Sequence, residues 1–262
     1  MSKQISFKGA KIAYTVNGTG KAVVLLHGFL EDRTMWNELV NKLSASCKVI
    51  AIDLPGFGDS GMISEKHSMK TMAEAVNAVI NNEGILRCTM IGHSMGGYVT
   101  LAYADLFIDK LNSIVLFHSQ AAADDEETKL VRNRTIKIVE SSHASFISSF
   151  IPSLFTDENA IKFKEEIREI IKRSLLTKNE GIIAALAGMR DRMDFIKLLS
   201  QLEIPILFIA GKLDSRIPVN KITEQIEIPK FSESLILDNV GHMGFIEAKE
   251  ITFNTIAQFV NK

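Results

Sequence analysis

The chain of 262 residues is poor in cysteine, in net charge and in long apolar runs, and each shortage excludes a class of protein. Its two cysteines, Cys47 and Cys88, form neither a disulfide framework nor a zinc-binding spacing. Both adjoin apolar segments, which predicts buried free thiols. A formal net charge of −1 provides no field that would hold the chain on nucleic acid or on an anionic membrane. We therefore expect a small-molecule partner.

The sequence also lacks apolar stretches long enough for a signal peptide or a membrane span, so we expect a cytoplasmic protein without membrane contact. With 46% hydrophobic and 23% charged residues, the composition is typical of globular enzymes. No internal repeat, low-complexity tract or flexible linker separates independent domains.

Short apolar runs alternate with helix-like segments along most of the chain. The first residues alternate apolar and polar side chains around Gly9, which predicts an antiparallel hairpin. The later runs lack this alternation, as is typical of parallel strands buried on both faces: AVVLL, VIAI, TMI, SIVLF, PILFIA and SLIL. Helices are expected at residues 71–80, 97–107, 219–228 and 245–260. The pattern predicts an α/β fold with a mostly parallel sheet, an antiparallel N-terminal hairpin and helices on both faces.

Residues 120–201 break this rhythm, because they contain amphipathic helical patterns and no convincing strand. We interpret them as a helical cap between two parts of an α/β core, at residues 1–119 and 202–262. One apolar face of the cap is predicted at Phe146, Ile147, Phe150, Ile151, Leu154 and Phe155, and a second at Ile161, Ile167, Ile170 and Ile171.

The segment Gly92-His93-Ser94-Met95-Gly96 matches the G-x-S-x-G nucleophile elbow. In this motif a serine occupies a strained turn between a strand and a helix, where flanking Cβ atoms would clash. An apolar run precedes the motif and a helix-like run follows it, as the elbow requires. Ser94 is therefore the candidate nucleophile.

A serine nucleophile needs a base and a carboxylate that orients the base. His242 follows the last apolar run and precedes the final helical segment, which suits a catalytic loop. Asp214 follows the PILFIA run and completes the chain order Ser, Asp, His; Asp238 is a less favoured alternative, because it lies very close to His242 along the loop. His27 and His93 are expected to shape loops, and His67 and His143 to be exposed or in the cap.

The oxyanion formed during attack requires preorganised N–H donors. The amide of Met95, which follows the nucleophile, is one candidate, and the amide of Phe29, after the first buried strand, is the other. Tentative pocket residues are Leu30, His118, Phe146, Phe150 and Met243. Four arginines of the cap segment could bind a carboxylated substrate, although arginine on cap helices more often faces solvent than a pocket: Arg132, Arg134, Arg190 and Arg192.

Together these motifs resemble the α/β-hydrolase superfamily, in its branch of small, helically capped serine esterases. The resemblance spans nearly the whole chain through HGFLEDRTMW, DLPGFGDS, GHSMGG, AGKLD and NVGH. Ser94 occupies the position where dehalogenases and epoxide hydrolases carry aspartate, which argues against both activities. Asp53, in DLPGFGDS, is expected to be structural.

The expected activity is cleavage of small, largely apolar carboxylic esters through an acyl-enzyme, without a metal or organic cofactor. Alternatives on the same fold are a lactonase, a carbon–carbon bond hydrolase, a lyase of the menaquinone-pathway type and a perhydrolase. A ligand receptor with slow turnover is the alternative from another class.

Overall fold

The computed structural model describes residues 2–262, and its centre is an eight-stranded sheet. The strands follow the order β1-β2-β4-β3-β5-β6-β7-β8. The two pairings of β2, with β1 and with β4, are antiparallel, and all other pairings are parallel. The fold class predicted from the sequence is confirmed. The strand bounds are β1 Ser2–Phe7, β2 Ala10–Asn17, β3 Lys21–Leu26, β4 Cys47–Ile52, β5 Cys88–His93, β6 Leu111–Phe117, β7 Ile206–Gly211 and β8 Ser232–Leu237.

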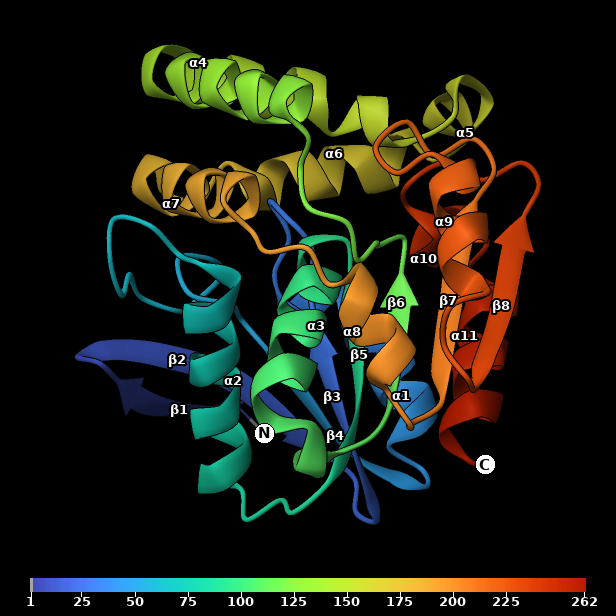
Figure 1. The fold of residues 1–262 in the computed structure, drawn as a ribbon. Coiled ribbons are helices and arrows are strands. Elements are labelled where there is room, and N and C mark those ends of the chain that lie inside the picture. Colours follow the sequence, from blue (N-terminus) through green and yellow to red (C-terminus); the bar gives the residue numbers. More distant parts are fainter. Residues whose placement is uncertain (1) are drawn as a thin grey trace.

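Helices cover both faces of the sheet, with α2 (Met69–Asn82) and α3 (Met95–Phe107) in front and α1 (Asn37–Leu43) and α11 (Lys249–Val260) behind in Figure 1. α9 (Val219–Ile226) connects β7 to β8, and the short α10 (Gly244–Glu247) precedes α11. Short 3₁₀ turns lie at Arg33–Trp36 and Ile108–Lys110. Both cysteines are buried and free, as predicted.

The structure corrects three details of the sequence interpretation. The run SLIL forms β8 at the edge of the sheet, where most of its side chains stay partly or fully exposed, because no strand lies beyond it. The expected helix at 245–260 is divided at Ala248, whose backbone angles are not helical. His67 is buried rather than exposed, and its Nε2 accepts a hydrogen bond from the Ile63 amide at 3.2 Å.

The segment between β6 and β7 contains only helices, and most of them lie over one end of the sheet (Figure 1). The first of them, α4, is kinked at Ser142, which has non-helical backbone angles. Figure 1 shows α8 below the other cap helices, level with the sheet, and the boundaries 120 and 201 remain a prediction. The elements are α4 (Glu126–Phe150), a 3₁₀ turn (Pro152–Leu154), α5 (Asp157–Lys162), α6 (Lys164–Ser174), α7 (Asn179–Arg190) and α8 (Ile196–Gln201).

The two apolar stripes predicted in this segment differ in outcome. In the first stripe, Ile147, Ile151, Leu154 and Phe155 are buried, and Phe146 and Phe150 are half-buried. In the second, Ile167 is buried but Ile161 is 78% exposed, so that part of the prediction is wrong. Ile161 belongs to the short helix α5, which ends before α6 begins, and the two helices therefore do not share one apolar face. Within residues 2–262, no helix combines the length and apolar character needed to cross a bilayer.

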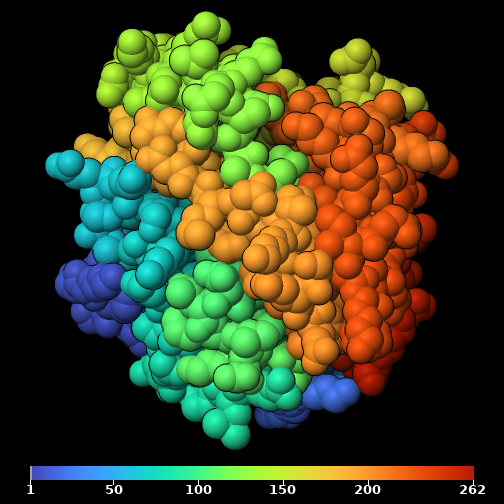
Figure 2. Space-filling model, in the orientation of Figure 1, coloured from blue at the N-terminus to red at the C-terminus, as the bar shows by residue number. Residues whose placement is uncertain are grey.

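The cap contacts the core closely where α7 meets the loop after β4. A Cβ at Gly188 would overlap the His67 carbonyl oxygen, and a Cβ at Gly181 would overlap the Gly56 carbonyl oxygen. The His67 amide also donates to the Ala184 carbonyl of α7 at 3.0 Å. The space-filling view shows the cap helices packed directly on the core (Figure 2).

We expect Gly188→Ala to lower the free energy of unfolding by about 1–3 kcal/mol despite the higher helix propensity of alanine, because the added methyl group forces α7 away from His67. Urea unfolding measures the change. Gly61→Ala is the matched control, since a Cβ there meets its nearest atoms at 3.5 Å and needs no displacement. Equal midpoints for the two variants would contradict the close approach.

Candidate active site

Ser94 lies at the sharp turn between β5 and α3, with φ 50 and ψ −114. Neighbouring glycines make this turn possible: a Cβ at Gly92 would overlap the Gly96 carbonyl, and one at Gly97 would overlap the Ser119 side chain. The Ser94 amide donates to the Phe117 carbonyl at 2.9 Å, which ties the turn to β6. The local sequence thus produces a strained, fixed position for the hydroxyl group.

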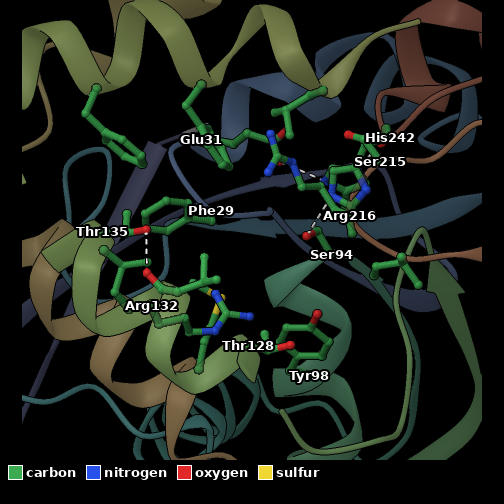
Figure 3. Close-up of a pocket in the computed structure, with 18 of the residues that line it drawn as sticks. Phe29, Glu31, Ser94, Tyr98, Thr128, Arg132, Thr135, Ser215, Arg216 and His242 are labelled. Carbon is green, nitrogen blue, oxygen red and sulfur yellow. Dashed lines mark hydrogen bonds and ion pairs between the residues drawn. The ribbon is translucent and has the colours of Figure 1, made fainter. Parts of the chain in front are cut away.

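Ser94, His242 and Asp214 form a continuous hydrogen-bonded chain. His242 Nε2 is 2.9 Å from Ser94 Oγ (Figure 3). His242 Nδ1 is 2.8 Å from Asp214 Oδ2. The other carboxylate oxygen of Asp214 accepts from the amides of Arg216 and Ile217 at 2.8 and 3.0 Å. The alternative carboxylate, Asp238, is 76% exposed and pairs with Lys212 at 2.5 Å. The geometry therefore favours Asp214 as the partner of His242.

A second histidine contacts the same carboxylate oxygen. His118 Nδ1 is 3.1 Å from Asp214 Oδ2, and burial lowers the pKa of His118 to about 4 although Asp214 opposes that shift. His118 is therefore neutral and donates through Nδ1. Burial alone would raise the pKa of Asp214, but the charge of His242 and hydrogen bonds from His118 and His242 hold it well below its usual range. Asp214 is therefore ionised at neutral pH.

The two amides proposed for the oxyanion hole come from separate elements near the hydroxyl. Met95 is the first residue of α3, so its N–H has no acceptor within the helix. Phe29 lies on the loop after β3 and lines the same pocket as Ser94. The next residue, Leu30, has a positive φ of 64°. Ser94 and His118, which also belong to this site, have positive φ angles as well.

A buried ion pair between Glu31 and His93 connects the loop after β3 with the loop that carries His242. Glu31 Oε2 accepts from the Gly28 amide at 2.7 Å and from His93 Nδ1 at 3.0 Å, and His93 Nε2 is 3.0 Å from the His242 carbonyl. Both ring nitrogens of His93 therefore face acceptors, which suits the protonated ring. The sequence placed His93 correctly as a loop-shaping residue but gave no sign of Glu31, because its partner lies 62 residues away.

A second unpredicted carboxylate, Glu247, organises the loop that carries His242. Its oxygens accept from the amides of Gly241 and Met243 at 3.1 and 3.0 Å, and from Asn159 of the cap at 2.7 Å. The His242 amide itself donates to the Leu154 carbonyl at 2.8 Å. The position of the base thus depends on the cap as well as on the core.

Ser94 and His242 lie on a pocket of about 480 Å³ beneath the cap. Phe29, Phe146, Phe150 and Leu186 supply part of its apolar wall. Of the tentative pocket residues, Phe146 and Phe150 line it. Leu30, His118 and Met243 do not line it, because all three are buried, and His118 Nδ1 faces Asp214.

Three of the four cap arginines singled out from the sequence do not line the pocket. Arg192 is buried and pairs with Asp124. Asp124 also pairs with Arg132, and of the four arginines only Arg132 lines the pocket. Arg190 pairs with Asp191, and Arg134 is exposed on α4. A fifth arginine, Arg216, lies on the pocket wall outside the cap, and the sequence motif around Asp214 did not reveal it.

The donor atoms of His118, Asp214 and His242 lie within 4.8 Å of one another, close enough in principle to hold a metal ion. The separations of both histidines from Asp214 are those of ordinary hydrogen bonds to one carboxylate oxygen. Hydrogen bonding therefore accounts for this cluster without a metal.

Comparisons with known proteins agree with this geometry. Residues 21–249 match the family described as alpha/beta hydrolase fold. The chain belongs to the α/β hydrolase family. A solved thermophilic esterase from Thermogutta terrifontis, with malate bound, is 30% identical and has a TM-score of 0.93; the match covers 100% of this chain and 98% of that one.

Two further relatives each match 93% of this chain. The pimeloyl-[acyl-carrier protein] methyl ester esterase of Aeromonas hydrophila is 26% identical, and the match covers 96% of its length. The dihydrolipoyllysine-residue acetyltransferase component of the acetoin cleaving system of Pseudomonas putida is 28% identical, but this chain spans only 64% of its length.

The Glu31–His93 pair of this α/β hydrolase predicts a particular pH dependence of stability. Burial by itself would raise the pKa of Glu31 and lower that of His93, but their mutual attraction and hydrogen bonds shift each pKa the other way. The stabilisation from Glu31 is present above its ordinary pKa of 4.5 and is lost as the pH falls through its lower folded value. That from His93 is complete below 6.5 and is lost as the pH rises through its raised folded value.

We therefore expect Glu31→Gln to destabilise the protein most between about pH 4.5 and 6.5, by about 3–5 kcal/mol, and less at alkaline pH. Urea unfolding at a series of pH values measures this. Glu38→Gln is the control, because Glu38 forms a surface ion pair with Lys249 at 2.9 Å and should contribute less than about 1 kcal/mol. A loss that is independent of pH would contradict the charged state of the pair.

Proposed function

We propose that the protein is a serine hydrolase that cleaves carboxylic esters of small, largely apolar substrates. The observation that carries this proposal is the 2.9 Å contact between Ser94 Oγ and His242 Nε2, which lies at a strained elbow on the wall of a pocket. An isolated serine hydroxyl is a weak nucleophile, and a histidine at this distance can take its proton during attack.

In the proposed reaction, Ser94 Oγ attacks the ester carbonyl carbon while its proton passes to His242 Nε2. The amides of Phe29 and Met95 stabilise the negative charge that develops on the carbonyl oxygen. The tetrahedral intermediate collapses, the C–O bond to the alcohol breaks, and His242 returns the proton to the departing alcohol. Water then attacks the acyl-enzyme with the same base, and the acid leaves as Ser94 regains its proton.

Asp214 orients His242 and stabilises the imidazolium that forms in both steps. Its second oxygen is held by the amides of Arg216 and Ile217, so the carboxylate has one fixed direction. His118 donates to the oxygen that faces His242 and remains neutral, which keeps a second positive charge away from the site.

Two relatives bear esterase names, and this supports ester cleavage above the other chemistries of the same triad. Lactonases, carbon–carbon bond hydrolases, lyases, perhydrolases and slow receptors could retain the same three residues. Steady-state turnover on a panel of simple acyl esters separates a hydrolase from a slow receptor. The apolar wall of Phe29, Phe146 and Phe150 supports a preference for substrates with an apolar chain.

We expect a fluorophosphonate probe to label Ser94, and Ser94→Ala to abolish labelling and reduce ester hydrolysis by several orders of magnitude without unfolding the protein. Mass spectrometry of the labelled peptide and a p-nitrophenyl acetate assay measure both effects. Ser200→Ala, on α8, is the control and should behave as the unmodified protein. Undiminished turnover in Ser94→Ala would exclude the mechanism.

Asp214→Asn should reduce kcat by roughly 10⁴-fold, because the Arg216 and Ile217 amides hold the side-chain oxygen and leave the NH2 group facing His242 Nδ1, which favours the wrong tautomer. A neutral amide also cannot stabilise the imidazolium. Asp238→Asn removes a carboxylate of the same kind from the surface and should change kcat by less than about twofold. Steady-state kinetics of both variants provides the comparison. A larger loss from Asp238→Asn would reassign the carboxylate and leave Ser94 and His242 in place.

A further inference from the structure

Arg216 brings a positive charge to the pocket wall without a carboxylate partner in the described part of the chain. Its guanidinium contacts a hydroxyl group, Ser153 Oγ, and the ring of Phe150. The nearby carboxylate of Asp214 is committed to two histidines and to the amides of Arg216 and Ile217. The Arg216 guanidinium therefore has donors to spare for a ligand.

The side chain of Arg216 is held in position by aromatic contacts that lead to the proposed oxyanion hole. Its guanidinium carbon lies 4.7 Å from the centre of the Phe150 ring, a cation–π arrangement. Phe150 in turn meets Phe29 edge to face, with ring centres 5.9 Å apart. Phe150 therefore links the guanidinium to Phe29, whose amide is a proposed oxyanion donor. In Figure 3, Arg216 lies on the same side of the pocket as His242 and Ser94.

The other charges on the pocket wall do not neutralise Arg216. Glu31 is bound to His93 and to the Gly28 amide. Glu127 belongs to the first turn of α4, whereas Phe150 ends that helix. Across the pocket, Arg132 shares the carboxylate of Asp124 with Arg192, so that cluster also carries excess positive charge.

The electrostatic state of Arg216 agrees with this arrangement. Burial lowers the pKa of Arg216, and the charge of Asp214 only partly opposes that shift. The group remains charged, because arginine does not lose its proton at physiological pH. A partly desolvated guanidinium favours an anion, and its planar fork matches a carboxylate in two-point geometry.

We propose that Arg216 binds a free carboxylate of the substrate, so that the preferred substrates are monoesters of dicarboxylic acids. This inference rests on the proposed ester hydrolysis and names its substrate class. The ester carbonyl lies at Ser94, the methylene chain follows the apolar wall of Phe146 and Phe150, and the distal carboxylate pairs with Arg216. The alcohol side of the ester carries no charge in this arrangement.

The test compares two methyl esters with acyl chains of equal length, monomethyl adipate and methyl hexanoate, which differ only in a terminal carboxylate or methyl group. The unmodified protein should prefer monomethyl adipate in kcat/KM. Arg216→Gln should lower the ratio of the two kcat/KM values by about 10- to 100-fold, the range expected for loss of a charge-assisted contact. Arg216→Lys should retain part of the preference, since it keeps the charge and loses the fork.

Arg134→Gln is the matched control, because Arg134 is exposed on α4 and does not line the pocket. It should leave the ratio unchanged. If Arg216 served only to link the Asp214 loop to Ser153, Arg216→Gln would slow both esters equally. An unchanged ratio would therefore overturn the proposal.

Binding without turnover distinguishes failure of this inference from failure of the proposed function. Calorimetry should show that monomethyl adipate binds Ser94→Ala at least about tenfold more tightly than it binds the Ser94→Ala/Arg216→Gln double variant. If binding depends on Arg216 but the unmodified protein turns over neither ester, the proposed hydrolysis is wrong and the carboxylate site stands. If the unmodified protein turns over both esters but the two variants bind monomethyl adipate equally, the carboxylate site is wrong and the proposed hydrolysis stands. Circular dichroism verifies folding, and if Arg216→Gln is unfolded, the same comparisons are made with Arg216→Lys.

Discussion

The buried carboxylate of Asp214 is the interaction on which the rest of the site depends. It accepts four hydrogen bonds. Two come from the side chains of His118 and His242, and two come from the backbone amides of Arg216 and Ile217 in its own turn. Removing a carboxylate from water is costly unless such donors replace the lost hydration. The group therefore fixes the turn after β7, the end of β6 at His118 and the His242 loop relative to one another.

The cap contributes to the chemistry as well as to the shape of the pocket. Its Leu154 carbonyl accepts the His242 amide, and its Thr156 and Asn159 bind Glu247, which holds the amides on both sides of His242. The close glycine contacts of α7 with the core hold the cap against this loop. A displacement of the cap would consequently move the base as well as open the pocket.

The pocket combines an apolar wall with a cation, Arg216. Phe150 serves both features, because one neighbour is the Phe29 ring and another is the Arg216 guanidinium. This arrangement suits a substrate that is apolar along its length and anionic at one end. An amphipathic stripe in the sequence reports the apolar side chains but carries no information about a cation supplied by a separate loop.

The sequence by itself determined the strand order along the chain, the hairpin, the elbow and the order of Ser94, Asp214 and His242. These features follow from local rules: apolar runs form buried strands, and glycines permit the strained turn at Ser94. Phe146 and Phe150 were predictable as pocket residues for the same reason, because they share one helical face.

Only the tertiary structure decided the contacts between residues distant in the chain. Glu31 meets His93 and Glu247 meets Asn159 across 62 and 88 residues, and no periodic pattern encodes such pairings. Leu30, His118 and Met243 turned out to be buried and not to line the pocket, because the direction of a side chain on a loop depends on how the loop packs. Arg216 stands beside Asp214 in the sequence, yet its position on the pocket wall arises only when Phe150 of the cap packs against it. Local propensity therefore decided which elements form, and long-range packing decided which side chains face the substrate.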